Sequence, residues 1–80
     1  MENNYEKSAY LYGKGAGSFK RGEFDEALNY YQQSLKLDNH SRTYARIYEC
    51  LLSLGKDEEA RPYIEIAYNM NKNHDKVAIQ

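Results

Sequence analysis

Gly22-Glu23-Phe24-Asp25-Glu26-Ala27-Leu28-Asn29-Tyr30-Tyr31 is matched, 33 residues further along the chain, by Gly55-Lys56-Asp57-Glu58-Glu59-Ala60-Arg61-Pro62-Tyr63-Ile64. Gly, Glu, Ala and Tyr recur at the same offset in the two stretches. An internal period of this length is typical of proteins built from stacked structural repeats. We therefore expect one domain over residues 1–80, with repeat one at about 8–40, repeat two at about 41–73 and a short helical tail at 75–80.

Repeat one is predicted to fold as two helices joined by a tight turn. Asn3 followed by Glu6 has the spacing of a capping box, so a helix is expected to begin there. It should end near Arg21, with Gly22 in the left-handed conformation. The acidic residues after Gly22 suit the positive end of a second helix, which should run to a turn cluster at residues 38–41.

Repeat two is predicted to have the same plan. Ser41 is expected to cap a helix that ends at Leu54, with Gly55 as its stop. Asp57 is expected to cap the last helix, and two glutamates that follow favour its positive end. That helix should fade near residues 71–73, ahead of the tail.

Charge and hydropathy exclude several classes of partner. The chain has 11 Lys and Arg residues against 12 Asp and Glu residues, a net charge of −1. A nucleic-acid-binding protein would show a clear basic excess, so no nucleic-acid partner is expected. No apolar run approaches the ~18 residues of a membrane span, so no membrane association is expected.

The cysteine and histidine content argues against a disulfide or a metal site. The single cysteine, Cys50, cannot form an internal disulfide or a cysteine zinc cluster, and we expect it to be a packed thiol. A reducing compartment, the cytoplasm, is therefore the predicted location. His40 and His74 have no carboxylate or thiol at ligand spacing, so no metal is expected.

Residues at set offsets within each repeat resemble the tetratricopeptide repeat family. The signature of that family places particular large, small and aromatic residues along a helical hairpin of about 34 residues. The turn that begins at Gly22 is the most specific part of the resemblance. The residues at those offsets are Leu11, Lys14, Gly15, Ser18, Ala27, Tyr31 and Asn39 in repeat one, and Tyr44, Ile47, Tyr48, Leu51, Ala60, Ile64 and Lys72 in repeat two. Lys14, Tyr48 and the absence of a proline at the end of each repeat depart from the family's pattern.

The resemblance implies an all-α fold in which two antiparallel helix-turn-helix units stack as a short right-handed solenoid. It also implies a non-enzymatic protein-binding module, whose groove is lined by the first helix of each repeat and holds a segment of another protein. Carried over to this chain, the expected groove residues are Ala9, Tyr12, Gly13, Ala16, Phe19 and Lys20 from the first helix and Arg42, Ala45, Arg46, Glu49 and Ser53 from the third.

The predicted groove combines aromatic side chains with positive charge. Tyr12 and Phe19 are residue types that anchor protein interfaces. Lys20, Arg42 and Arg46 supply cations, and arginine can hold a carboxylate with two hydrogen bonds. We therefore expect an acidic, partly apolar peptide as the ligand. The alternative is that the arginines form internal ion pairs with the neighbouring glutamate on an ordinary solvated helix face.

The glycine-rich segment at residues 13–17 does not indicate a cofactor. It matches neither a phosphate-binding loop nor a dinucleotide-binding fingerprint, so no nucleotide is expected. We expect Gly15 and Gly17 to lie at crowded helix contacts and Gly13 to face the groove. Helical glycines cost about 1 kcal/mol each relative to alanine, which predicts a weak first helix.

Two repeats are few for a stable solenoid, because about three are normally needed. The last helix is predicted to carry apolar side chains that no complete helix covers, and such a surface favours association. One alternative reading is therefore a self-assembling homodimer, and another is a fragment of a longer repeat protein. The interface candidates on the last helix are Tyr63, Ile64, Ile66, Tyr68 and Met70.

Overall fold

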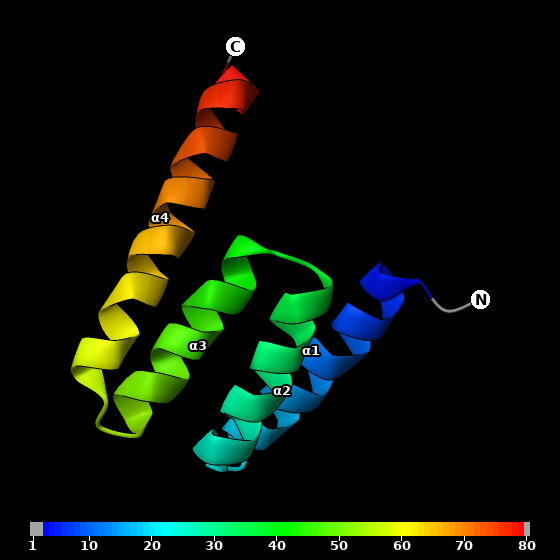
Figure 1. Ribbon diagram of the computed structural model, residues 1–80, viewed down its shortest axis with the longest axis vertical. Helices are drawn as coiled ribbons and strands as arrows, with labels where there is room; N and C mark the ends of the chain where they lie inside the picture. The colour runs from blue at the N-terminus through cyan, green and yellow to red at the C-terminus, as the bar shows by residue number, and fades with distance from the viewer. Residues whose placement is uncertain (1–2, 80) are drawn as a thin grey trace.

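Four α-helices make up the part of the chain that the computed structural model describes, which is residues 3–79 for the backbone and 3–71 for the side chains. They are α1 (Asn4–Lys20), α2 (Phe24–Leu37), α3 (Ser41–Ser53) and α4 (Asp57–Ile79), and residues 3–79 contain no strand (Figure 1). The predicted all-α fold is confirmed.

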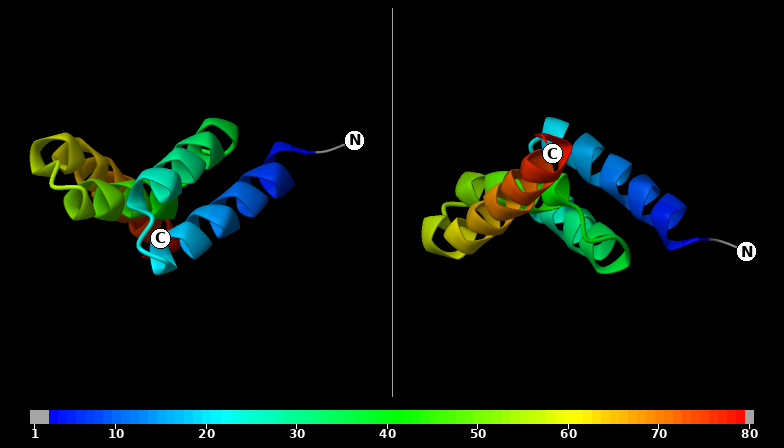
Figure 2. Two further views of the ribbon diagram at one scale, coloured as in Figure 1. Left: turned by 90° about the horizontal axis from the view of Figure 1, so that it is seen from below. Right: turned by 90° about the horizontal axis from the view of Figure 1, so that it is seen from above.

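Each helix packs against the next one in the chain. α1 contacts α2, α2 contacts α3, and α3 contacts α4, with successive helices running in opposite directions. Figure 2 shows the resulting antiparallel hairpins side by side, with the N-terminal end of α1 projecting away from α3 and α4. The molecule measures 41 × 38 × 18 Å, so it is thin and every helix keeps exposed residues along one side. A right-handed solenoid sense stays a prediction.

The turns within the two hairpins have the same backbone structure. Gly22 and Gly55 have φ angles of 78° and 77°, the left-handed conformation that glycine adopts without steric cost. In both turns the paired hydrogen bonds of a Schellman helix end are present, which satisfies carbonyls left open at the helix C-terminus. Their N–H to carbonyl pairs are Glu23 to Ser18 (2.9 Å), Gly22 to Phe19 (3.0 Å), Lys56 to Leu51 (2.8 Å) and Gly55 to Leu52 (3.0 Å).

The core lies between the two hairpins and draws on α2, α3 and α4. Ala27 and Ala60, which occupy equivalent positions in the two repeats, are both fully buried. Larger side chains complete the cluster, and a second ring of half-buried apolar residues packs around it. The cluster consists of Ala27, Tyr31, Ile47, Cys50, Leu51 and Ala60, with Tyr12, Phe19, Leu28, Leu35, Tyr48 and Tyr63 around it.

The close approach of α1 to α2 depends on Gly15. A Cβ atom added to Gly15 would lie 2.9 Å from Cδ1 and Cε1 of Tyr31, a distance that real Cβ atoms do not show. The predicted close packing at Gly15 is therefore confirmed. The crowding predicted at Gly17 is wrong, because the nearest atom, Nη1 of Arg21, lies at an ordinary 3.4 Å. Gly13 has no atom within 4 Å of such a Cβ.

Two serines join α1 and α2 at the other end of the first hairpin. Ser8 Oγ donates to the Ser34 carbonyl over 2.9 Å, and Ser34 Oγ donates to the Ser8 carbonyl over 2.8 Å. Both side chains are buried, so each hydroxyl has its partner where water does not compete. With the Gly15–Tyr31 contact, these bonds fix α1 on α2 along most of its length.

The helix starts agree only partly with the sequence predictions. Asn3 caps α1 as expected, since its Oδ1 accepts from the Glu6 N–H over 2.7 Å. His40 rather than Ser41 caps α3, with Nδ1 accepting from the Arg42 N–H over 3.2 Å. Ser41 is instead the first residue of α3, and its Oγ donates to Asn71 Oδ1 over 2.8 Å.

α4 differs most from its prediction. Asp57 is its first helical residue and not its cap, because the first backbone bond runs from the Ala60 N–H to the Lys56 carbonyl. The helix continues through residues 71–73, where asparagine is a weak helix former but no helix breaker, and reaches Ile79. The predicted tail at 75–80 is thus continuous with α4, apart from Gln80, which lies outside the described residues.

Within residues 3–79, no helix has both the length and the apolar character needed to cross a membrane.

Substitutions at two glycines of α1 should have opposite effects on stability. Gly13→Ala should raise the free energy of unfolding by about 1 kcal/mol, because it improves helix propensity in open space. Gly15→Ala should lower it by about 1–3 kcal/mol, because the new methyl group overlaps the buried Tyr31 ring. Urea unfolding of both variants measures the difference, and a stabilising Gly15→Ala would contradict the packing described here.

Candidate functional site

A hollow of about 240 Å³ lies between α1 and α3, with α2 beneath it. We call it the α1–α3 hollow. Of the residues predicted to line a groove, the structure brings five together here, joined by one residue of α2. The lining residues are Tyr12, Ala16, Phe19, Lys20, Tyr31 and Arg46.

Tyr12 is the centre of the polar contacts across this hollow. The Arg46 Nε–H donates to Tyr12 Oη over 3.1 Å, joining α3 to α1. The Arg42 guanidinium lies over the Tyr12 ring, with Cζ 4.7 Å from the ring centroid. The other neighbour of Tyr12 is Tyr31, whose ring centroid is 5.2 Å away. Tyr12 is thus fixed by a hydrogen bond, a cation–π contact and an aromatic contact.

The two arginines beside Tyr12 differ in their ion pairing. Arg46 Nη1 donates to both carboxylate oxygens of Glu49, over 2.9 and 3.1 Å. The hydrogen bond to Tyr12, and then the Glu49 carboxylate, raise the pKa of Arg46 above its usual value. Within the described part of the chain, Arg42 and Lys20 have no carboxylate partner. The alternative of an internally paired face therefore describes Arg46 but not Arg42 or Lys20.

Six predicted groove residues do not line the hollow, and one of them, Arg42, is next to it through its contact with the Tyr12 ring. Gly13, Ala9 and Ser53 are exposed, and Ala45 is half-buried. Glu49 reaches the hollow only through its pair with Arg46. None of the six residues is part of the lining of any hollow described among residues 3–71.

Two aromatic residues were not predicted as part of the site. Tyr31 was expected only to occupy one of the family's set offsets in repeat one, yet it lines the hollow while remaining 1% exposed. Tyr5 is 66% exposed and precedes Tyr12 by seven residues, which puts both on one side of α1. The seven-residue spacing of Tyr5, Tyr12 and Phe19 is a signal that the sequence already contained.

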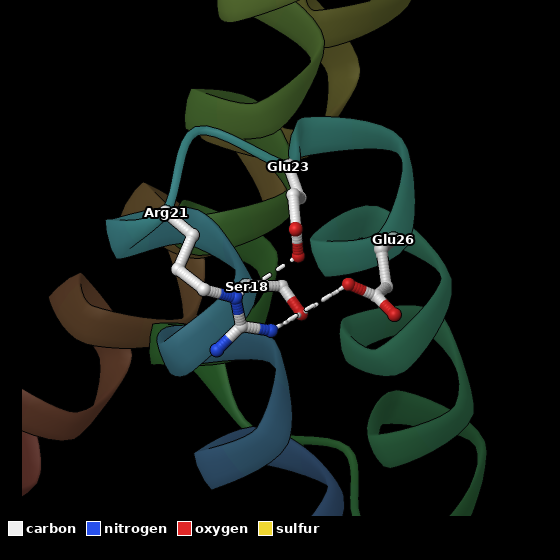
Figure 3. A network of polar contacts seen from close by, with 4 residues as sticks. All are labelled: Ser18, Arg21, Glu23 and Glu26. Atoms are coloured by element: carbon white, nitrogen blue, oxygen red, sulfur yellow. Dashed lines mark hydrogen bonds and ion pairs between the residues drawn. The ribbon is translucent and has the colours of Figure 1, made fainter.

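A polar network of four residues closes the turn between α1 and α2 (Figure 3). Arg21 Nε–H donates to Glu23 Oε2 over 3.0 Å, and Ser18 Oγ donates to Glu26 Oε2 over 3.0 Å. Arg21 also lies 3.6 Å from the Glu26 carboxylate. The network ties the C-terminal end of α1 to the start of α2.

Among the side chains that the structure describes, no three His, Cys, Asp or Glu residues gather as a metal-binding group.

A second and larger hollow, of about 410 Å³, is lined by residues of α2, α3, α4 and the turn between α3 and α4. Its two charged residues, Lys56 and Glu59, have opposite signs, and it includes one aromatic side chain. The α1–α3 hollow is smaller but has three aromatic residues and an excess of positive charge. We therefore favour the α1–α3 hollow as the candidate site. The second hollow is lined by Leu28, Gln32, Leu51, Lys56, Glu59 and Tyr63.

The equal turns and the shared core define a protein built from helical-hairpin repeats. Residues 8–41, which cover most of α1 and all of α2, match the family model described as "Tetratricopeptide repeat". This segment is therefore a tetratricopeptide repeat, and the four helices are consistent with two such repeats. Searches among curated proteins and among solved structures gave no match.

Two buried groups, the Cys50 thiol and the Tyr31 hydroxyl, should make the free energy of unfolding decrease at alkaline pH. Burial raises the pKa of the Cys50 thiol to about 11 and that of Tyr31 to about 12. The folded state then keeps protons that the unfolded chain releases, so the free energy of unfolding should decrease as pH rises from about 9 to about 11. Urea unfolding at pH 7 and pH 10 measures the loss.

Cys50→Ala provides the control for this prediction. It removes the first group to titrate, so the variant should lose less stability than the wild type between these two pH values. An equal loss in both proteins would show that the buried thiol does not contribute.

Proposed function

We propose that this chain is a non-enzymatic protein-binding module that holds an acidic, partly apolar segment of another protein at the α1–α3 hollow. A tetratricopeptide repeat supports a role in protein–protein interaction in general. The observation that supports this particular site is the juxtaposition of the half-buried Tyr12 and Phe19 with two cations, Arg42 and Lys20, that have no carboxylate partners in the described chain.

The size of the hollow favours a peptide over a small molecule. Pockets for small ligands typically occupy about 300–1,000 Å³ and enclose most of the ligand. At about 240 Å³ the α1–α3 hollow is below that range and fits one large side chain of a longer ligand. Anchoring of one or two such side chains is how peptide grooves gain most of their affinity.

Arg42 is the residue that we propose for carboxylate recognition. Its guanidinium is held over the Tyr12 ring, which limits the rotamer freedom that would otherwise be lost on binding. Its N–H donors form no side-chain hydrogen bond within the described residues, so they are available to a ligand. A cytoplasmic location fits this proposal and the single buried thiol.

Reversing the charge at Arg42 should weaken binding without unfolding the chain. Peptides selected from a random display library against the wild-type protein would be titrated against Arg42→Glu. We expect at least a tenfold weaker Kd, about 1.4 kcal/mol, because a repulsive carboxylate replaces a donor. The matched control is Arg61→Glu on exposed α4, which should bind as the wild type does. Equal binding by both variants would contradict the proposed site.

Self-assembly through α4 is a second candidate function. A comparison of residues in α2 with the residues 33 positions later in α4 favours it. Tyr31 in α2 lies between α1 and α3, whereas its equivalent in α4, Ile64, is half-buried with no further helix beside it in the described chain. Leu35 is half-buried, and its equivalent, Tyr68, is 63% exposed. Of the other candidates on α4, Ile66 is exposed, while Tyr63 and Met70 are half-buried.

Light scattering over a hundredfold range of concentration tests self-assembly. If α4 is the interface, mass should rise with concentration, and Tyr68→Glu should abolish the rise. Tyr10→Glu is the matched control, because Tyr10 is 64% exposed but lies on α1. A constant monomer mass for the wild type would exclude this candidate.

A further inference from the structure

The exposed side of α1 carries a regular pattern that continues beyond the α1–α3 hollow. Tyr5, Ala9, Tyr12, Ala16 and Phe19 follow one another at intervals of four, three, four and three residues. We call this set the α1 stripe. The residues of α1 that are buried against α2 are others, Ser8, Gly15 and Ser18, although two rings of the stripe also reach α2. Tyr12 contacts Tyr31, and Phe19 contacts Phe24 with ring centroids 5.1 Å apart. Along the stripe, Tyr5 and Ala9 are exposed, and the other three are half-buried.

This spacing is the one by which a helix contacts a second helix. Intervals of three and four residues place side chains in a single seam, and knobs of the partner helix pack between them. In the α1 stripe, large aromatic side chains alternate with alanines, so depressions are expected at Ala9 and Ala16. Ala16 lines the α1–α3 hollow, whereas Ala9 is exposed and belongs to none of the hollows described among residues 3–71.

The distance between the two alanines distinguishes a helical ligand from an extended one. Seven residues along α1 span about 10.5 Å. In a helical ligand, residues seven apart lie on one side and span the same distance. In an extended ligand, residues on one side repeat at about 6.6 or 13 Å, which does not match. A polyproline helix repeats at about 9.3 Å, which is more than an ångström short.

The charges beside the stripe identify the chemistry of that helix. Arg42 covers Tyr12, Lys20 follows Phe19, and Arg46 lines the hollow from α3. Glu49 neutralises only Arg46. A ligand helix would therefore gain from carboxylates on the flank that faces α3, next to its apolar seam.

We infer that the segment held at this site is an amphipathic α-helix with an acidic flank, lying along α1 with large apolar side chains seven residues apart over Ala9 and Ala16. This inference rests on the proposed function and adds the conformation and the pattern of the ligand. The binding mode is that of a helix in a groove, in which side chains at helical spacing make the main contacts.

Two peptide libraries of equal composition, displayed together, test the conformation. Both use peptides of about 18 residues, long enough to lie along α1, rich in glutamate and with five randomised apolar positions. In the helical library these positions are three and four residues apart, and in the extended library they alternate. Selection against the wild-type protein should enrich helical members by at least tenfold over extended ones.

The Kd values of the selected helical peptides, synthesised individually, are the second measurement. A lactam bridge between two solvent-facing positions four residues apart should tighten the Kd, because the helix is then formed before binding. Proline at the peptide centre should weaken the Kd at least tenfold, because it breaks the helix. Enrichment of extended or proline-containing peptides, or a bridged peptide that binds worse, would overturn the helical mode.

Variants of α1 locate the helix. Ala16→Leu and Ala9→Leu fill the two depressions and should each weaken binding of a helical winner at least tenfold. Ala9 is exposed, so its variant should keep the wild-type melting temperature. The matched control is Gln33→Leu, which adds the same side chain to an exposed position on α2 and should leave the Kd unchanged. Binding that survives both alanine substitutions would overturn the placement on α1.

The outcomes separate this inference from the proposed function. If neither library enriches, or if winners bind Arg42→Glu as well as the wild type, the proposed site is wrong and the helical mode falls with it. If the winners depend on Arg42 but come from the extended library, the site stands and only the helical mode is overturned.

Discussion

The contact between the Tyr31 ring and the bare backbone of Gly15 is the constraint on which the rest of the structure depends. It brings α1 close enough to α2 that a Cβ at residue 15 would overlap the ring. The same ring contacts Tyr12 and lines the α1–α3 hollow, so core and candidate site share one side chain. The helical glycine costs about 1 kcal/mol in propensity. The buried aromatic surface that it makes possible offsets that cost.

The two hairpins share one backbone turn but differ in how side chains close it. In the first, Ser18, Arg21, Glu23 and Glu26 form a polar network. The equivalent of Ser18 in the second hairpin is Leu51, which belongs to the buried core. Polar contacts near the surface therefore stabilise the first turn, whereas the burial of Leu51 in the core stabilises the second. Both satisfy the same backbone geometry, which glycine with a positive φ provides.

Much of this fold could be predicted from the chain because it depends on local signals. The 33-residue offset, the glycines at 22 and 55 and the cap at Asn3 are readable within a few residues of where they act. The cap of α3 was missed because histidine ranks below serine as a cap, and Ser41 forms a tertiary hydrogen bond to Asn71 instead. The extent of α4 was missed because asparagine weakens a helix without ending it.

The residues of the candidate site could be predicted where their position on a single helix face brings them together. They could not be predicted where the packing of several helices brings them together. Five groove residues meet around the hollow because spacings of three and four residues place them on facing sides of α1 and α3. The role of Tyr31 could not be read in this way, because only the packed structure shows that the second helix reaches the floor between the other two. Ser53 has groove spacing, yet it lines none of the hollows described for residues 3–71, and spacing alone does not say where a hollow ends.

The two arginines next to Tyr12 differ in what they offer to the acidic ligand that we propose. Arg46 already has a carboxylate, so an acidic ligand must compete with Glu49 for it and gains only the difference between two ion pairs. Arg42 has its orientation fixed by the Tyr12 ring and has no carboxylate partner among residues 3–71, so the ligand that we propose would gain the whole interaction at little cost in side-chain entropy. The Arg46–Tyr12 hydrogen bond in turn fixes the ring on which Arg42 lies. In the binding mode that we propose, Arg46 therefore acts mainly by positioning Tyr12, and Arg42 recognises the acidic side chain of the ligand.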